Sequence, residues 1–107
     1  MSFSNDTETA VLNYIFKDIA PAYAGQANFW IALHTADPGE AGTAVTSEAA
    51  YGSYARVSVT RSTGFTVSGN TVSNTALVQF PQSSSGGSAI THATVVTTSS
   101  GAGTIIG

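Results

Sequence analysis

Apolar side chains recur at steps of three and four over the first twenty residues, which is the spacing of one helical face. The residues of this face are Val11, Leu12, Ile15, Phe16 and Ile19. The pattern predicts an amphipathic helix over 4–20, with Asn5 as its cap and Glu8 in capping-box spacing. Pro21 is expected to end it. The apolar face either packs on a sheet or docks on a neighbouring subunit.

The stretch Asn28–Gly42, NFWIALHTADPGEAG, predicts a strand that runs into a tight turn. Apolar residues occupy both alternating faces of its first half, which is typical of a strand covered on both sides. The strand is expected to end at Asp37-Pro38-Gly39. Proline presets one turn dihedral, glycine tolerates a positive φ, and aspartate accepts bonds from nearby backbone N–H groups.

Short strands and turns are expected in the rest of the chain, at 54–61, 65–68, 71–80, 89–98 and 104–106. Gly69-Asn70 reads as a two-residue hairpin turn, and Asn74 as a polar interruption that needs a partner. The segment 82–88, QSSSGGS, has linker composition and is expected to be a flexible loop. The fold class is therefore mainly β: a β-sandwich or jelly-roll-like domain with one N-terminal amphipathic helix. Residues 1–107 are expected to form a single domain, with 28–107 as its β-rich body.

Charge is scarce, at 8% of 107 residues with a formal net charge of −3, and no Lys, Arg, Asp or Glu follows Arg61. Free β-edges are normally guarded by charge. An uncharged, β-rich half therefore predicts a homo-oligomer or a larger assembly that covers these edges, unless a compact barrel or sandwich hides its own edges. The only Lys and Arg residues are Lys17, Arg56 and Arg61, too few to neutralise a nucleic acid backbone.

The N-terminus is polar and acidic rather than basic and apolar, so no secretory signal is expected. The apolar runs are too short to span a membrane. No membrane partner is expected, and the chain is expected to be made in a cytoplasm.

Candidate chemistry is sparse. There is no cysteine, and His34 and His92 are the only histidines. His34 lies close in sequence to Asp37 and Glu40, so a His–carboxylate pair is conceivable, although such a residue is more often satisfied by a structural partner. No catalytic, metal or cofactor site is predicted. Tyr51 and Tyr54 either contact a sugar or protein from a loop or cover the rim of the core.

Several blocks of the sequence together resemble a family of small virion proteins of tailed bacteriophages. The blocks are ALHTADPGEAGT, AYGSYARVSVTRS, FTVSGNTVSNTALVQFP and SGAGT. They span about 29–106, and the first two are the most specific. Members are often labelled tail fibre proteins, and small decorating proteins of the phage head have similar size and composition. The chain departs from this pattern after 104–106, where relatives continue.

The resemblance implies a non-enzymatic structural component of a virion, assembled in the host cytoplasm. The leading expectation is a capsid decoration, or cement, protein that binds junctions of the major capsid protein. The alternative is a tail or tail-fibre component that contacts other tail proteins or a host surface glycan. The expected assembly contacts are Asp37, Pro38, Gly39, Glu40, Tyr51 and Tyr54.

Overall fold

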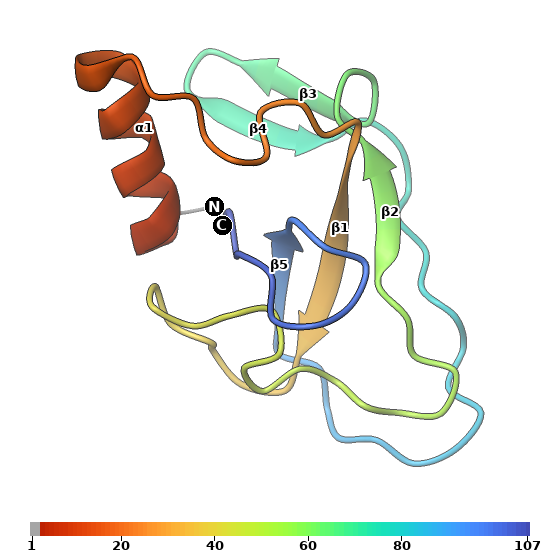
Figure 1. The fold of residues 1–107 in the computed structure, drawn as a ribbon. Helices are drawn as coiled ribbons and strands as arrows, with labels where there is room; N and C mark the ends of the chain where they lie inside the picture. The colour runs from red at the N-terminus through yellow and green to blue at the C-terminus, as the bar shows by residue number, and fades with distance from the viewer. Residues whose placement is uncertain (1–2) are drawn as a thin grey trace.

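Two antiparallel sheets and one helix make up the protein in a computed structural model that describes residues 3–107 (Figure 1). Residues 1 and 2, which belong to the predicted single domain, lie outside this range. Helix α1 spans Asn5–Lys17. The first sheet has the order β2-β1-β5 and the second is the hairpin β3-β4. The strands are β1 (Asn28–His34), β2 (Val57–Thr60), β3 (Phe65–Ser68), β4 (Thr71–Asn74) and β5 (His92–Val96). The predicted class, mainly β with an N-terminal helix, is confirmed in a sandwich-like form.

Strand β1 is the centre of the larger sheet, because β2 and β5 pair with its two edges. Ile31 is opposite Val57 on one side and Val95 on the other. Phe29 is buried on one face of the strand, while Ala32 and His34 are buried on the other. The expectation that this strand is covered on both faces is therefore confirmed.

The core lies on the face of β1 that carries Ala32. Ala32, Ala44, Val96 and Ile105 form one buried cluster, and Trp30 packs against it. The two alanines let the loop after β1 approach the sheet closely. Burial of β-branched side chains in β5 favours its extended conformation.

Three predicted strands are shorter in the structure: the strand expected over 89–98 is β5, His92–Val96, and the other two are shortened for local reasons. The strand expected over 54–61 begins only at Val57, because the backbone N–H of Tyr54 donates to Tyr51 O (3.0 Å) and closes a turn. The strand expected over 71–80 ends at Asn74, whose side-chain Nδ2 donates to Ala76 O (2.8 Å). Asparagine that bonds its neighbouring backbone competes with strand pairing. The partner that Asn74 needed is thus local.

The C-terminal segment pairs within the chain. Val96 and Ile105 form an isolated bridge, and the N–H of Ile106 donates to Val95 O (2.7 Å). On its other side, the N–H of Ser4 donates to Ile106 O (3.0 Å). The two ends of the described chain consequently lie side by side (Figure 1), and residues near the N-terminus complete the predicted final hairpin.

Both ends of α1 differ from prediction. Ser4, not Asn5, is the N-cap: Ser4 has extended backbone angles, and its Oγ accepts the N–H of Thr7 (3.2 Å). The helix ends at Lys17 rather than at Pro21, because Asp18 adopts a left-handed conformation (φ 56°) and the N–H of Ile19 bonds Asn13 O. A left-handed residue of this kind commonly ends a helix.

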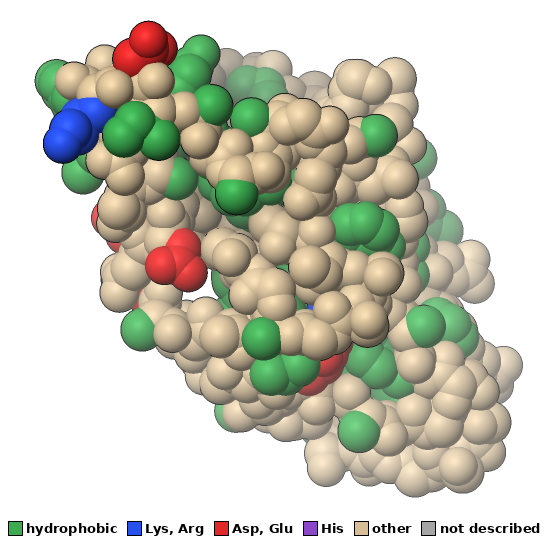
Figure 2. Space-filling model, viewed as in Figure 1, with side chains coloured by type: hydrophobic (Ala, Val, Ile, Leu, Met, Phe, Trp, Pro, Cys, Tyr) green, Lys and Arg blue, Asp and Glu red, His purple; other side chains and the backbone are tan. Residues whose placement is uncertain are grey.

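The interpretation that the apolar face of α1 packs on a sheet is wrong. The helix stands at the side of the body (Figure 1), and hydrophobic side chains are visible on its surface (Figure 2). Among the buried residues of α1 there is only Thr7, whose Oγ1 donates to Ile106 O (2.9 Å). The helix is therefore fixed by its polar N-terminal turn rather than by its apolar face.

Candidate functional site

The acidic turn after β1 is one of the two predicted contact regions. Asp37 Oδ1 accepts the backbone N–H of Gly39 (2.9 Å), and Gly39 has φ 75°, a value that favours glycine. Gly42 is equally constrained, because a Cβ there would overlap the carbonyl of Pro38. Glu40 O accepts the N–H of Asn5 (3.0 Å), which joins the turn to α1. The predicted structural role of this turn is thereby explained.

A cleft of about 440 Å³ lies beside this turn. Its apolar lining comes from Phe3, Ile31, Val95 and Ile105, and its acidic residues are Asp37 and Glu40. Asp37, Gly39 and Glu40 are exposed, whereas Pro38 is half-buried. Such a surface can receive an apolar or cationic group of a protein partner. The described residues contain no cluster of three His, Asp or Glu side chains that could hold a metal ion.

Tyr51 and Tyr54 belong to a different part of the surface, since neither lines the cleft. Their rings meet edge to face at 5.4 Å, and Tyr54 stacks on Phe80 at 6.3 Å. The Tyr51 hydroxyl donates to Pro81 O (2.8 Å), and the backbone N–H of Gly52 bonds Ser85 O (2.7 Å). Tyr51 and Gly52 therefore tether the segment 81–85, and Tyr54 packs between Tyr51 and Phe80. This arrangement supports the rim interpretation over a sugar-binding one.

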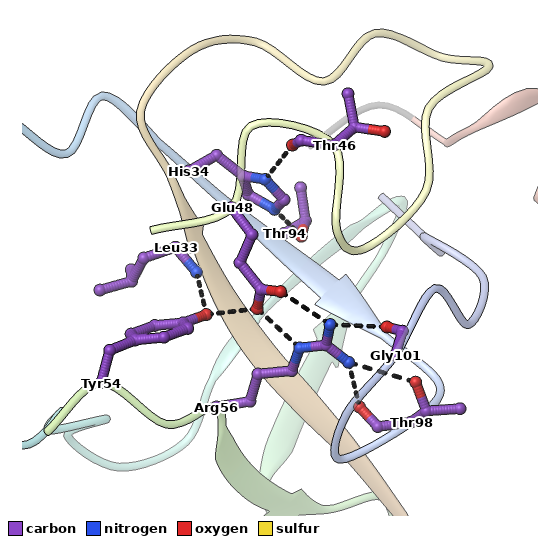
Figure 3. A network of polar contacts seen from close by, with 9 residues as sticks. All are labelled: Leu33, His34, Thr46, Glu48, Tyr54, Arg56, Thr94, Thr98 and Gly101. Atoms are coloured by element: carbon purple, nitrogen blue, oxygen red, sulfur yellow. Dashed lines mark hydrogen bonds and ion pairs between the residues drawn. The ribbon is translucent and has the colours of Figure 1, made fainter. Parts of the chain in front are cut away.

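The strongest polar cluster of the structure was not predicted: it is built on Arg56 and Glu48 (Figure 3). Arg56 Nε and Nη2 donate to the two carboxylate oxygens of Glu48 at 2.7 and 2.9 Å. Nη1 donates to Thr98 O (3.0 Å) and Oγ1 (3.2 Å), and Nη2 also donates to Gly101 O (2.7 Å). All five N–H groups of the guanidinium are thus satisfied, in the fork geometry that arginine provides.

This pair is largely removed from water, with side-chain exposures of 3% for Arg56 and 15% for Glu48. The Tyr54 hydroxyl donates to Glu48 Oε2 (2.6 Å) and accepts the N–H of Leu33 (3.2 Å). The cluster therefore joins β1, the loop 42–50, the segment before β2 and the loop after β5. The loop 42–50 also pairs with β1 through a bridge between His34 and Glu48, and the cluster adds side-chain bonds that cross-link this loop to the loop after β5.

Glu48 and Arg56 stabilise each other's charged form. Burial raises the pKa of Glu48, but the hydrogen bonds from Arg56 and Tyr54 outweigh it and hold that pKa below its usual range. The bonds to Glu48 raise the pKa of Arg56. Burial, together with the bond to Glu48, raises the pKa of Tyr54 to about 12. At neutral pH the carboxylate and guanidinium are charged and the phenol is neutral, a combination that stabilises rather than catalyses.

His34 forms no pair with Asp37 or Glu40. It is fully buried, its Nδ1 lies 2.9 Å from Thr46 O, and its Nε2 lies 2.7 Å from Thr94 Oγ1. Because a carbonyl oxygen only accepts, Nδ1 donates to Thr46 O, and both contacts are drawn in Figure 3. His34 is thus satisfied by a backbone carbonyl and a hydroxyl, and it fastens the loop 42–50 to β5.

Arg61 is also used inside the fold. Its Nη1 lies within hydrogen-bond distance of Tyr23 O (2.8 Å), Ala24 O (3.1 Å) and Gln26 O (2.8 Å). The guanidinium carbon lies 4.6 Å from the centre of the Phe29 ring, a cation–π contact. Two of the three cations of the chain therefore hold its own loops.

In the described part of the chain, no helix has both the length and the apolar character needed to cross a membrane.

One comparison with known proteins gives a match. Residues 2–106 match the family described as Podophage GP4 fiber I protein gp80. No curated protein matches the chain, and no solved structure does. The match covers nearly the whole sequence, including the acidic turn, the Arg56–Glu48 cluster and α1.

Proposed function

The chain belongs to the family of Podophage GP4 fiber I protein gp80, a family of phage virion structural proteins, and we propose that it is a fibre component of a tailed phage. The observation that carries this proposal is the match over residues 2–106, because the description names a fibre protein. Membership in a structural family also favours a role in assembly over a role in catalysis.

The surface supports a role in assembly. Large apolar side chains are exposed on α1, and the chain after Arg61 has no charged side chain to guard its edges. Both features suit a protein whose surface is covered by other virion proteins in the assembled particle. We assign the exposed turn 37–40, with the cleft beside it, to one such contact.

The fibre role replaces capsid decoration as the leading proposal. The sequence blocks resembled both kinds of virion protein, whereas the matched family is described by a fibre protein. A junction with the major capsid protein is accordingly not proposed. A host glycan is not proposed either, because the hydroxyls of Tyr51 and Tyr54 are bonded within the fold.

Separation of tails from heads tests the proposal. Purified virions are split into tail-free, DNA-filled heads and free tails, and the chain is counted in each fraction relative to the major capsid protein. A fibre component is expected with the tails, in tens of copies per virion at most. Hundreds of copies on tail-free heads would instead support capsid decoration and overturn the fibre role.

A further inference from the structure

A stripe of exposed apolar side chains follows α1 and is left without a partner in the described chain. It consists of Val11, Leu12, Ile15 and Phe16 on the helix and Ile19 just past its end, with exposed fractions of 39, 57, 63, 78 and 52%. Exposed hydrophobic patches of this kind mark contact surfaces in folded proteins. We propose that the stripe pairs with the same stripe of a second copy of this chain, in an antiparallel helix pair.

The helix is held in a way that keeps the stripe available. Ser4 and Thr7 bond the C-terminal segment, and Asn5 bonds Glu40, so the first turn is fixed to the body. Past this turn the side chains of the stripe are exposed, and Figure 2 shows hydrophobic side chains on the surface over α1. A partner can therefore reach the stripe without any change in the fold.

The area of the stripe is adequate for a self-complementary contact. A large apolar side chain presents roughly 150 Å² when fully exposed, so the stripe offers about 400 Å² per copy. Two stripes then bury about 800 Å², within the range of small, transient interfaces below about 1,200 Å². A contact between identical surfaces needs no further partner.

Charge selects the antiparallel arrangement. Glu8 in the first turn of α1 lies in line with the stripe, whereas Lys17 in the last turn lies on the opposite side of the helix. In an antiparallel pair, the acidic turn of one helix lies beside the last turn of the other, and the helix dipoles are opposed. A parallel pair would place the two Glu8 carboxylates, which continue the line of the stripe, next to each other.

Self-association also suits the scarcity of free cations. Arg56 and Arg61 are engaged inside the fold, and Lys17 lies at the far end of α1. An acidic partner would find little to bind, whereas helix packing depends on shape and apolar area. The pairing is a property of the isolated chain, so it does not depend on the proposed fibre role.

Sedimentation equilibrium of the full chain tests the pairing. The wild type is expected to dimerise, and Phe16→Ser to weaken dimerisation at least about tenfold, the effect of 1.4 kcal/mol. Leu77→Ser is the matched control, since Leu77 is 85% exposed and lies outside α1. Circular dichroism verifies that each variant is folded, and Leu12→Ser serves as a second stripe variant. A monomeric wild type, or a dimer that survives both stripe variants, would overturn the proposal.

Mild oxidation of Glu8→Cys tests the direction of the helices, because the chain contains no cysteine of its own. In the antiparallel pair the two positions 8 lie about 16 Å apart along the axis, at 1.5 Å per residue. A disulfide needs Cα atoms within about 7 Å. No cross-linked dimer is therefore expected, and efficient cross-linking of Glu8→Cys to itself would contradict the antiparallel arrangement.

Discussion

Replacement of Arg56 by alanine is expected to be the most damaging change of a charged residue in this chain. The substitution removes five donated hydrogen bonds and leaves the Glu48 carboxylate, which is only 15% exposed, without its cation. Breaking a buried ion pair by deleting one partner costs about 3–5 kcal/mol. A domain of this size has about 5–15 kcal/mol of total stability, so the loss is a large part of the whole.

Thermal and urea unfolding, followed by circular dichroism, measure this effect. In a domain near 100 residues, each kcal/mol of lost stability lowers Tm by about 4 °C or more. Arg56→Ala is therefore expected to lower Tm by at least about 12 °C. Arg56→Lys should fall between this variant and the wild type, because lysine keeps the charge and loses the fork geometry. Lys17→Ala, at an exposed position, is the control and should stay within about 0.5 kcal/mol.

A small effect of Arg56→Ala would contradict the role of the cluster as a cross-link. If Arg56→Ala lowers the free energy of unfolding by less than about 1 kcal/mol, the cluster is not the cross-link between the loops. The same conclusion follows if Lys17→Ala is equally harmful, since the loss would then reflect net charge rather than the buried pair.

Three further predictions concern the pH response and the turns. Because the pKa of Tyr54 is raised to about 12, the free energy of unfolding should fall as pH rises from about 10 to 12. Urea titrations should show a shallower fall in Tyr54→Phe, and an equal dependence on pH in both proteins would contradict this role of Tyr54. Gly42→Ala should be clearly destabilising in thermal melts because its Cβ would overlap Pro38, whereas Gly25→Ala, which meets no atom, should be neutral or slightly stabilising. Ser4→Ala should cost about 1 kcal/mol through the lost cap, and an unchanged Tm would show that another group caps α1.

The central strand and the turn after it were accessible from sequence for a clear physical reason. Alternation in Asn28–His34 and the residues Asp37-Pro38-Gly39 are local signals, and the structure confirms both. The ends of other strands were less accessible. Alternation continues past Asn74, but the local bond from its side chain ends β4 there.

The Arg56–Glu48 cluster could not be read from local pattern. In the sequence Glu48 has no charged neighbour, and Arg56 is one position of the strand expected over 54–61. Their contact depends on how two loops fold over β1, a long-range property. The one available signal was that cations are scarce. The chain has three Lys and Arg residues, and Arg56 lies two positions after Tyr54 in an expected strand, a place that favours a buried acidic partner.

The apolar face of α1 shows the converse limit. Its periodicity correctly predicted a helix, yet periodicity alone does not say what covers the face. The alternative of docking on a neighbouring subunit, open at the level of sequence, is the one that the exposed stripe supports.

Gold-labelled antibody against this chain, imaged on intact virions by electron microscopy, tests the fibre role most directly. Gold is expected on fibres at the tail end of the particle, with the capsid surface unlabelled. Label spread evenly over the capsid would contradict it and return the chain to the class of capsid decoration proteins.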